Sequence, residues 1–173
     1  MSHPRRKLPT ILKALQDGLC RVVMLVIIVL TAVMVASMCA QVFWRYVLND
    51  SLIWPEEVSR YAFIWVSCLG MSVGARRGDL IAIDVLWAGR PKRVRLFISI
   101  VARVLTIPLL IVFAWEGCVL INVVAGQRAA ATNVPVWWIY LALPVSSVLA
   151  LSFMLETIAR DVRALSLLED AGE

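Results

Sequence analysis

Long apolar runs alternate with short charged segments along the chain. Residues 22–44 carry no charge and form a run long enough to cross a hydrocarbon core of about 30 Å. Comparable runs cover residues 52–75, 96–124 and 133–157. In the run 52–75 only Tyr61 to Ala75 is free of charge, and Arg103 and Glu116 interrupt the run 96–124. The pattern predicts an all-α integral membrane protein with four transmembrane helices, the last bent by Pro144.

A shorter apolar stretch lies between the second and third runs, at residues 79–88, and basic residues flank it. It is too short to span a bilayer, so we expect a short interfacial helix on the cytoplasmic face, with a re-entrant loop as the alternative. The predicted organisation is a basic cytoplasmic segment at 1–21, a four-helix membrane domain at 22–158 and a cytoplasmic tail at 159–173.

The basic residues lie mainly on one side of these predicted spans. If the N-terminus is cytoplasmic, all but three of the 17 Lys and Arg residues fall inside, the exceptions being Arg45, Arg60 and Arg128. Basic residues concentrate in the cytoplasmic loops of membrane proteins, so we expect both termini in the cytoplasm. This distribution also accounts for the net charge of +5 without nucleic-acid binding.

Composition agrees with a membrane protein. Hydrophobic residues make up 61% of the chain and charged residues 17%, below the quarter that is typical of soluble proteins. The four cysteines have no zinc or disulfide spacing, and His3 is the only histidine. A haem anchor draws its axial ligands from its helices, so anchoring a redox enzyme is disfavoured and we expect no metal or cofactor.

The stretch WPEEVSRY, residues 54–61, concentrates polar chemistry at the start of the second predicted span. Proline suits the first helical turn, and acids there complement the helix dipole. Glu56 and Arg60 are four residues apart, a spacing that favours an ion pair. No histidine, nucleophilic serine motif or metal-ligand cluster joins the two acids, so we expect no enzyme activity. Aromatic residues that could form an interfacial belt surround the stretch: Trp44, Tyr46, Trp54, Tyr61 and Trp65.

Small residues recur every four positions in three of the predicted helices, where they would let helices approach closely. Representative positions are Ala36, Gly70, Gly74 and Ser146. They could pack within this chain or against another membrane protein, and both remain open. Among the charges, we expect Arg103 to reach the inner surface and Glu156 to pair with Arg160.

The stretch from Phe43 to Leu86, with Trp54, Glu56-Glu57 and Arg60-Tyr61 in order, resembles the small permease subunit of tripartite ATP-independent periplasmic (TRAP) transporters. The later VPVWWIYLALPVSSVL resembles the final helix of that family. One departure is Leu80, where the family often has histidine. The resemblance covers about residues 20 to 160.

The resemblance implies a non-catalytic subunit of the bacterial inner membrane. In that family a periplasmic solute-binding protein delivers an organic acid, and a large multi-helix permease subunit imports it using an ion gradient. The small subunit packs on the large one and extends its scaffold. We expect partner contact or assembly to involve Arg45, Tyr46, Trp54, Glu56, Glu57, Arg60 and Asp84. The alternative is an autonomous oligomeric transporter or channel that uses Glu116.

Overall fold

The computed structural model describes residues 8–50, 52–77 and 92–170, and these residues are mainly helical. The helices are α1 (Leu8–Val47), α2 (Trp54–Arg77), α4 (Lys92–Val124), α5 (Trp137–Tyr140) and α6 (Ala142–Asp170). Four helical segments are long and apolar enough to cross a membrane: Ala14–Val47, Trp54–Arg76, Ile98–Val124 and Trp137–Val162. The predicted class, an all-α membrane protein with four spans, is therefore confirmed. The predicted interfacial helix, with Asp84, lies outside the described residues.

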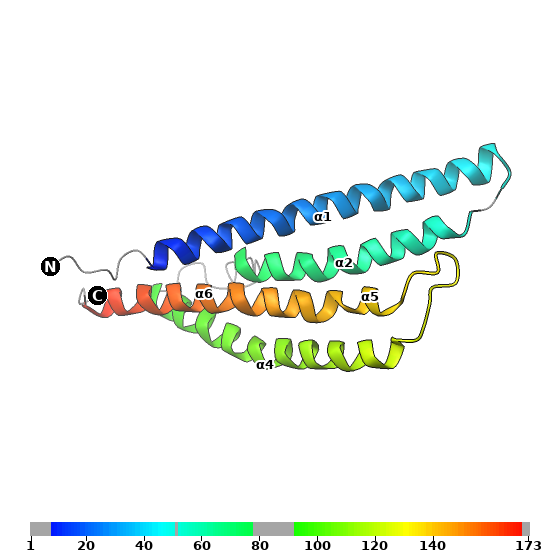
Figure 1. Ribbon diagram of the computed structural model, residues 1–173. Helices are drawn as coiled ribbons and strands as arrows, with labels where there is room; N and C mark the ends of the chain where they lie inside the picture. The colour runs from blue at the N-terminus through cyan, green and yellow to red at the C-terminus, as the bar shows by residue number, and fades with distance from the viewer. Residues whose placement is uncertain (1–7, 51, 78–91, 171–173) are drawn as a thin grey trace.

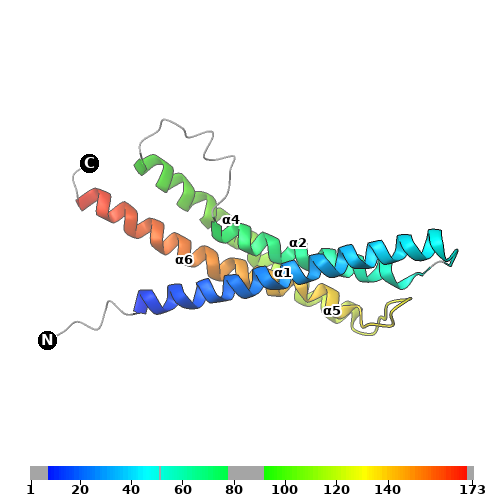
Figure 2. The same cartoon turned by 90° about the horizontal axis from the view of Figure 1, so that it is seen from above.

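The four long helices lie side by side in one open layer, in the order α1, α2, α6, α4 (Figure 1). We call the end of the layer where α1 begins and α6 finishes the terminal end, and the opposite end the loop end. Figure 2 shows α1 crossing over α2 and α6 when the layer is seen from above. Only 11% of the apolar window of α1 or α4 is buried, against 39% for the span that contains α6. The two outer helices therefore leave most of their surface uncovered.

Two small apolar clusters join the helices across the layer. In the first, Cys20 and Val23 of α1 meet Leu69 and Val73 of α2 around Phe153 of α6, which is fully buried. The second cluster joins α4 to α6 through Leu110, Ala150 and Met154. The helices α2 and α6 therefore form the centre of the layer, with α1 on one side and α4 on the other.

Buried serines lie inside the layer of helices. Ser59, Ser72 and Ser146 are almost completely buried. Each hydroxyl donates a hydrogen bond to a carbonyl three or four residues earlier in its own helix, at 2.8 Å, 2.7 Å and 3.0 Å respectively. This local bond satisfies the hydroxyl where no water is available, so a small polar side chain can occupy an apolar helix contact.

Two ion pairs between helices lie in the terminal half of the layer. Arg76 of α2 pairs with Asp17 of α1, and its guanidinium also lies 5.3 Å from the ring centre of Phe153. Arg103 of α4 pairs with Asp161 of α6, and the two side chains are only 11% and 19% exposed. Nothing in the sequence indicates Asp161 as the partner of Arg103, and the extension of Arg103 to the inner surface stays a prediction.

The last span begins with an interruption. The short helix α5 is followed by Leu141 and then by α6, in which Pro144 is the third residue. Proline has no N–H, so Pro144 cannot donate to the carbonyl of Tyr140 four residues earlier. The last span is thus divided at Leu141, three residues before Pro144, and the bend itself stays a prediction.

Candidate functional site

The polar stretch at residues 54–61 forms the start of α2 at the loop end of the layer. The helix begins at Trp54, and both Glu56 and Glu57 lie in its first turn, as the sequence predicts. There the free backbone N–H groups and the helix dipole favour negative charge. Arg60 pairs with Glu56 at 2.7 Å, and both side chains are well exposed, so this pair presents opposite charges on the surface.

Glu57 has a different environment, which the sequence does not indicate. Its Oε1 accepts a 2.7 Å hydrogen bond from the Tyr61 hydroxyl. Its Oε2 accepts bonds from the backbone N–H groups of Ala131 and Thr132, at 3.2 Å and 2.7 Å. Those residues belong to the loop between α4 and α5. One carboxylate therefore ties the start of α2 to that loop and holds the loop end of the layer together.

The other predicted contact residues do not join this network. Arg45, near the end of α1, lies over the ring of its neighbour Tyr46, 5.9 Å from its centre. In the part of the chain that the structure describes, no hydrogen bond or ion pair connects Arg45 with Glu56 or Glu57. Tyr46 and Trp54 are both exposed at the loop end. The structure thus brings together Glu56 with Arg60 and Glu57 with the loop, while Arg45, Tyr46 and Trp54 lie on the surface outside both contacts.

The predicted small-residue positions differ in what they contact. Ser146 is fully buried in the layer. A methyl group added at Gly70 or Gly74 would meet nothing within 4 Å, so neither glycine makes a close contact with the residues that the structure describes. Gly117, which lies outside the small-residue positions predicted from the sequence, is close to Leu143 and Pro144 of α6. Contact of Gly70 and Gly74 with another membrane protein remains a prediction.

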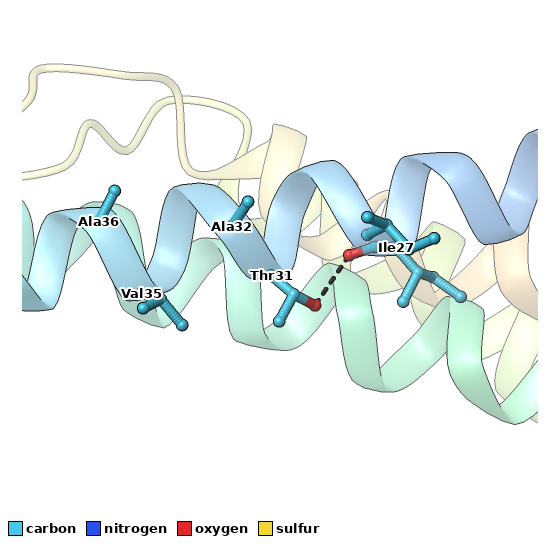
Figure 3. Close-up of a pocket in the computed structure, with 6 residues that line it drawn as sticks. Ile27, Thr31, Ala32, Val35 and Ala36 are labelled. Carbon is cyan, nitrogen blue, oxygen red and sulfur yellow. Dashed lines mark hydrogen bonds between the residues drawn. The ribbon is translucent and has the colours of Figure 1, made fainter.

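Ala36 lies on the exposed side of α1. It contributes to a shallow apolar groove of about 570 Å³, lined by Ile27, Ile28, Thr31, Ala32, Val35 and Ala36 (Figure 3). The only hydroxyl in this set belongs to Thr31, and it donates a 2.8 Å hydrogen bond to the carbonyl of Ile27 in the same helix. The groove therefore offers apolar contact without a free polar group.

Glu116 is an exposed residue of α4. Within residues 8–50, 52–77 and 92–170, its carboxylate has no hydrogen-bond or ion-pair partner. An acid placed within a bilayer costs about 2.5–3.5 kcal/mol on the insertion scale. Glu116 borders a small pocket to which Leu143 of α6 also contributes, and the alternative of an autonomous oligomeric transporter or channel that uses Glu116 stays a prediction. The described residues also contain no group of three or more His, Cys, Asp or Glu that could hold a metal ion.

Comparison with known proteins matches residues 34–164 to the family described as "Tripartite ATP-independent periplasmic transporters, DctQ component". The chain is 31% identical over 110 residues to the sialic acid TRAP transporter permease protein SiaT of Haemophilus influenzae, covering 64% of this chain and 18% of that protein. It is 29% identical over 131 residues to the isethionate TRAP transporter permease protein DctMQ of Oleidesulfovibrio alaskensis, covering 71% of this chain and 21% of that protein.

A third relative has a similar length to this chain. The sialic acid TRAP transporter small permease protein SiaQ of Vibrio cholerae is 23% identical over 152 residues, which cover 85% of each protein. Against SiaT and DctMQ, by contrast, the chain spans only about a fifth of the relative. Sequences like this one thus occur both as separate small proteins and as parts of much larger permeases.

Proposed function

Because the chain belongs to the DctQ-component family of tripartite ATP-independent periplasmic transporters and is a multi-pass protein of the inner membrane, we propose that it serves as the small membrane subunit of such a transporter. In this role it packs on a large multi-helix permease subunit and extends the fixed scaffold of that subunit. The large subunit imports an organic acid that a periplasmic solute-binding protein delivers, and an ion gradient drives the import. The small subunit itself catalyses no reaction.

The observation that carries this proposal is the open layer of helices. Its two outer helices, α1 and α4, have the same low burial and long apolar surfaces. A protein that acted alone would gain from closing such helices around a central pathway. A flat layer instead adds width to another membrane protein, and helices in lipid associate by close packing on such surfaces.

The layer is also braced in a way that suits a fixed scaffold. Ion pairs join α1 to α2 and α4 to α6 in the terminal half, through Arg76 and Arg103. At the loop end, Glu57 holds the loop between α4 and α5 against α2. Contacts between different elements thus lie at both ends of the layer, and together they restrain the helices from sliding during transport by the large subunit.

The distribution of charge supports a periplasmic position for the loop end. The basic residues of the described terminal half include Arg21, Arg76 and Arg103, which the positive-inside tendency assigns to the cytoplasm. Arg45 and Arg60 lie at the opposite end. The exposed Glu56–Arg60 pair, Tyr46 and Trp54 would then face the periplasm, where a solute-binding protein could contact them.

Reconstitution into liposomes tests the proposal. Four preparations would be compared for uptake of the solute that the binding protein carries. Three contain the binding protein, together with the large subunit alone, this chain alone or both membrane subunits. The fourth contains both membrane subunits without the binding protein. The proposal predicts gradient-dependent uptake only when both membrane subunits and the binding protein are present. Uptake by this chain alone would favour the autonomous transporter. Full uptake by the large subunit without this chain would contradict a scaffold role.

A further inference from the structure

A single carboxylate interrupts the apolar outer surface of α4. Glu116 is exposed, and exposed apolar residues of α4 lie near it: Trp115 is 70% exposed, and Val123 is 69% exposed. Beside the carboxylate is a small pocket of about 170 Å³, whose lining also includes Gly117, Val119, Leu120, Val123 and Leu143. Leu143 belongs to α6, so the pocket lies where α4 and α6 meet. An acid here has a shaped recess next to it but no partner among the described residues.

The depth of Glu116 restricts what could pair with it. It lies eight residues before Val124, the last residue of α4, or about 12 Å along the helix. Side chains on a helix tilt toward its N-terminus, which for α4 is the terminal end of the layer. The carboxylate is therefore directed toward the middle of the membrane rather than toward the nearer headgroups at the loop end. A lipid headgroup is a poor partner for that reason.

Charge also disfavours a second copy of this chain as the partner. A symmetric contact through this face of α4 would place two Glu116 carboxylates near one another, and like charges in a low-dielectric site repel strongly. A cationic or hydrogen-bond-donating side chain from a different membrane helix would instead compensate the acid. The larger relatives SiaT and DctMQ, of which this chain matches about a fifth, contain further sequence within the same permease.

We propose that Glu116 marks the face of α4 on which the large permease subunit docks, and that a cationic or hydrogen-bond-donating side chain of one of its membrane helices pairs with this carboxylate. The inference rests on the proposed function, because it needs a large permease subunit as partner. It adds to that function a specific surface and a polar contact within it. The pocket beside Glu116 provides room for the tip of the incoming side chain.

Photocrosslinking in native membranes tests this assignment. A photoreactive amino acid replaces Val123, which lies two turns from Glu116 on nearly the same side of α4. After irradiation, the tagged chain is purified and its adducts are identified by mass. The proposal predicts an adduct with the large permease subunit. Adducts only with a second copy of this chain, or only with lipid, would overturn it.

The same probe is then combined with Glu116→Leu and with a matched control, Asn122→Leu. Asn122 is also an exposed polar residue of α4, but its side-chain amide already donates a 3.1 Å hydrogen bond to Cys118 O in the same helix. Removing one member of a desolvated polar pair leaves the other unpaired, so Glu116→Leu should lower the crosslink yield at least about tenfold. Asn122→Leu should keep the wild-type yield. Equal yields in the two variants would overturn the proposal.

A measurement on the wild-type chain distinguishes failure of the docking assignment from failure of the proposed function. Co-purification without irradiation, in mild detergent, reports whether any large permease subunit binds at all. If the subunit co-purifies but Glu116→Leu does not change the crosslink, the docking assignment fails and the proposed function stands. If no large subunit is recovered with the wild-type chain, the proposed function fails as well. The amount of each variant in the membrane fraction confirms that insertion is unchanged.

Discussion

The contact between α4 and α6 at Gly117 leads to a quantitative prediction about stability. A methyl group added there would lie 2.8 Å from Cδ of Pro144 and 3.2 Å from Cβ of Leu143. The first distance is shorter than real methyl contacts, and a proline ring cannot rotate out of the way. The substitution Gly117→Ala should therefore push α4 away from α6. Inserting an extra carbon into a packed contact costs about 1–3 kcal/mol.

Gly70→Ala is a matched control for that substitution. Gly70 also lies inside a membrane-spanning helix, but a methyl group there would meet nothing within 4 Å. Both substitutions gain about the same helix propensity, about 1 kcal/mol, so their difference isolates the packing term. We expect Gly117→Ala to unfold at a lower temperature than Gly70→Ala by about 2–12 °C, since 1 kcal/mol corresponds to about 2–4 °C in a chain of this size.

Thermal unfolding of the purified chain in one detergent, followed by tryptophan fluorescence, measures this difference. Gly74→Ala provides a second control, because its added methyl group would also be free of contacts. If all three variants shifted the midpoint equally, the close approach of α4 and α6 at Gly117 would be refuted.

Two further predictions concern the contacts that connect the helices at each end of the layer. Arg103→Ala should lower the free energy of unfolding by about 2–3 kcal/mol, because it leaves the Asp161 carboxylate unpaired in a largely buried site. The double variant Arg103→Met with Asp161→Leu should recover most of that loss, and a double variant as unstable as the single one would contradict the ion pair. Glu57→Ala should speed hydrogen exchange at the loop amides of residues 131 and 132, measured by mass spectrometry, because their acceptor is removed. Glu56→Ala, one residue earlier, should leave those amides protected, and equal exchange in both variants would show that Glu57 does not hold the loop.

Local sequence rules predicted the helical elements and the start of α2. Apolar runs long enough to cross a bilayer coincide with four helices, because the backbone in lipid must satisfy its own hydrogen bonds. The Trp54-Pro55 step and the acids after it predicted where α2 begins. The Glu56–Arg60 pair followed from its spacing of four residues alone.

Contacts between distant segments could not be predicted in this way. Arg103 and Asp161 are 58 positions apart, and nothing near either residue indicates the other. The hydrogen bonds between Glu57 and the loop between α4 and α5 likewise join residues far apart in the sequence. Only the bond from Tyr61, four positions after Glu57, could have been predicted from spacing. Which small residues make contact depends on how the helices face one another, and spacing alone does not determine that.

The central claim, that this chain works as one part of a larger membrane complex, is tested most directly by native mass spectrometry. The tagged chain would be purified from native membranes in mild detergent, and the mass of the intact complex would give the identity and number of its subunits. The account predicts one copy of this chain bound to one much larger multi-helix protein. A homo-oligomer of this chain, with no second protein, would contradict it.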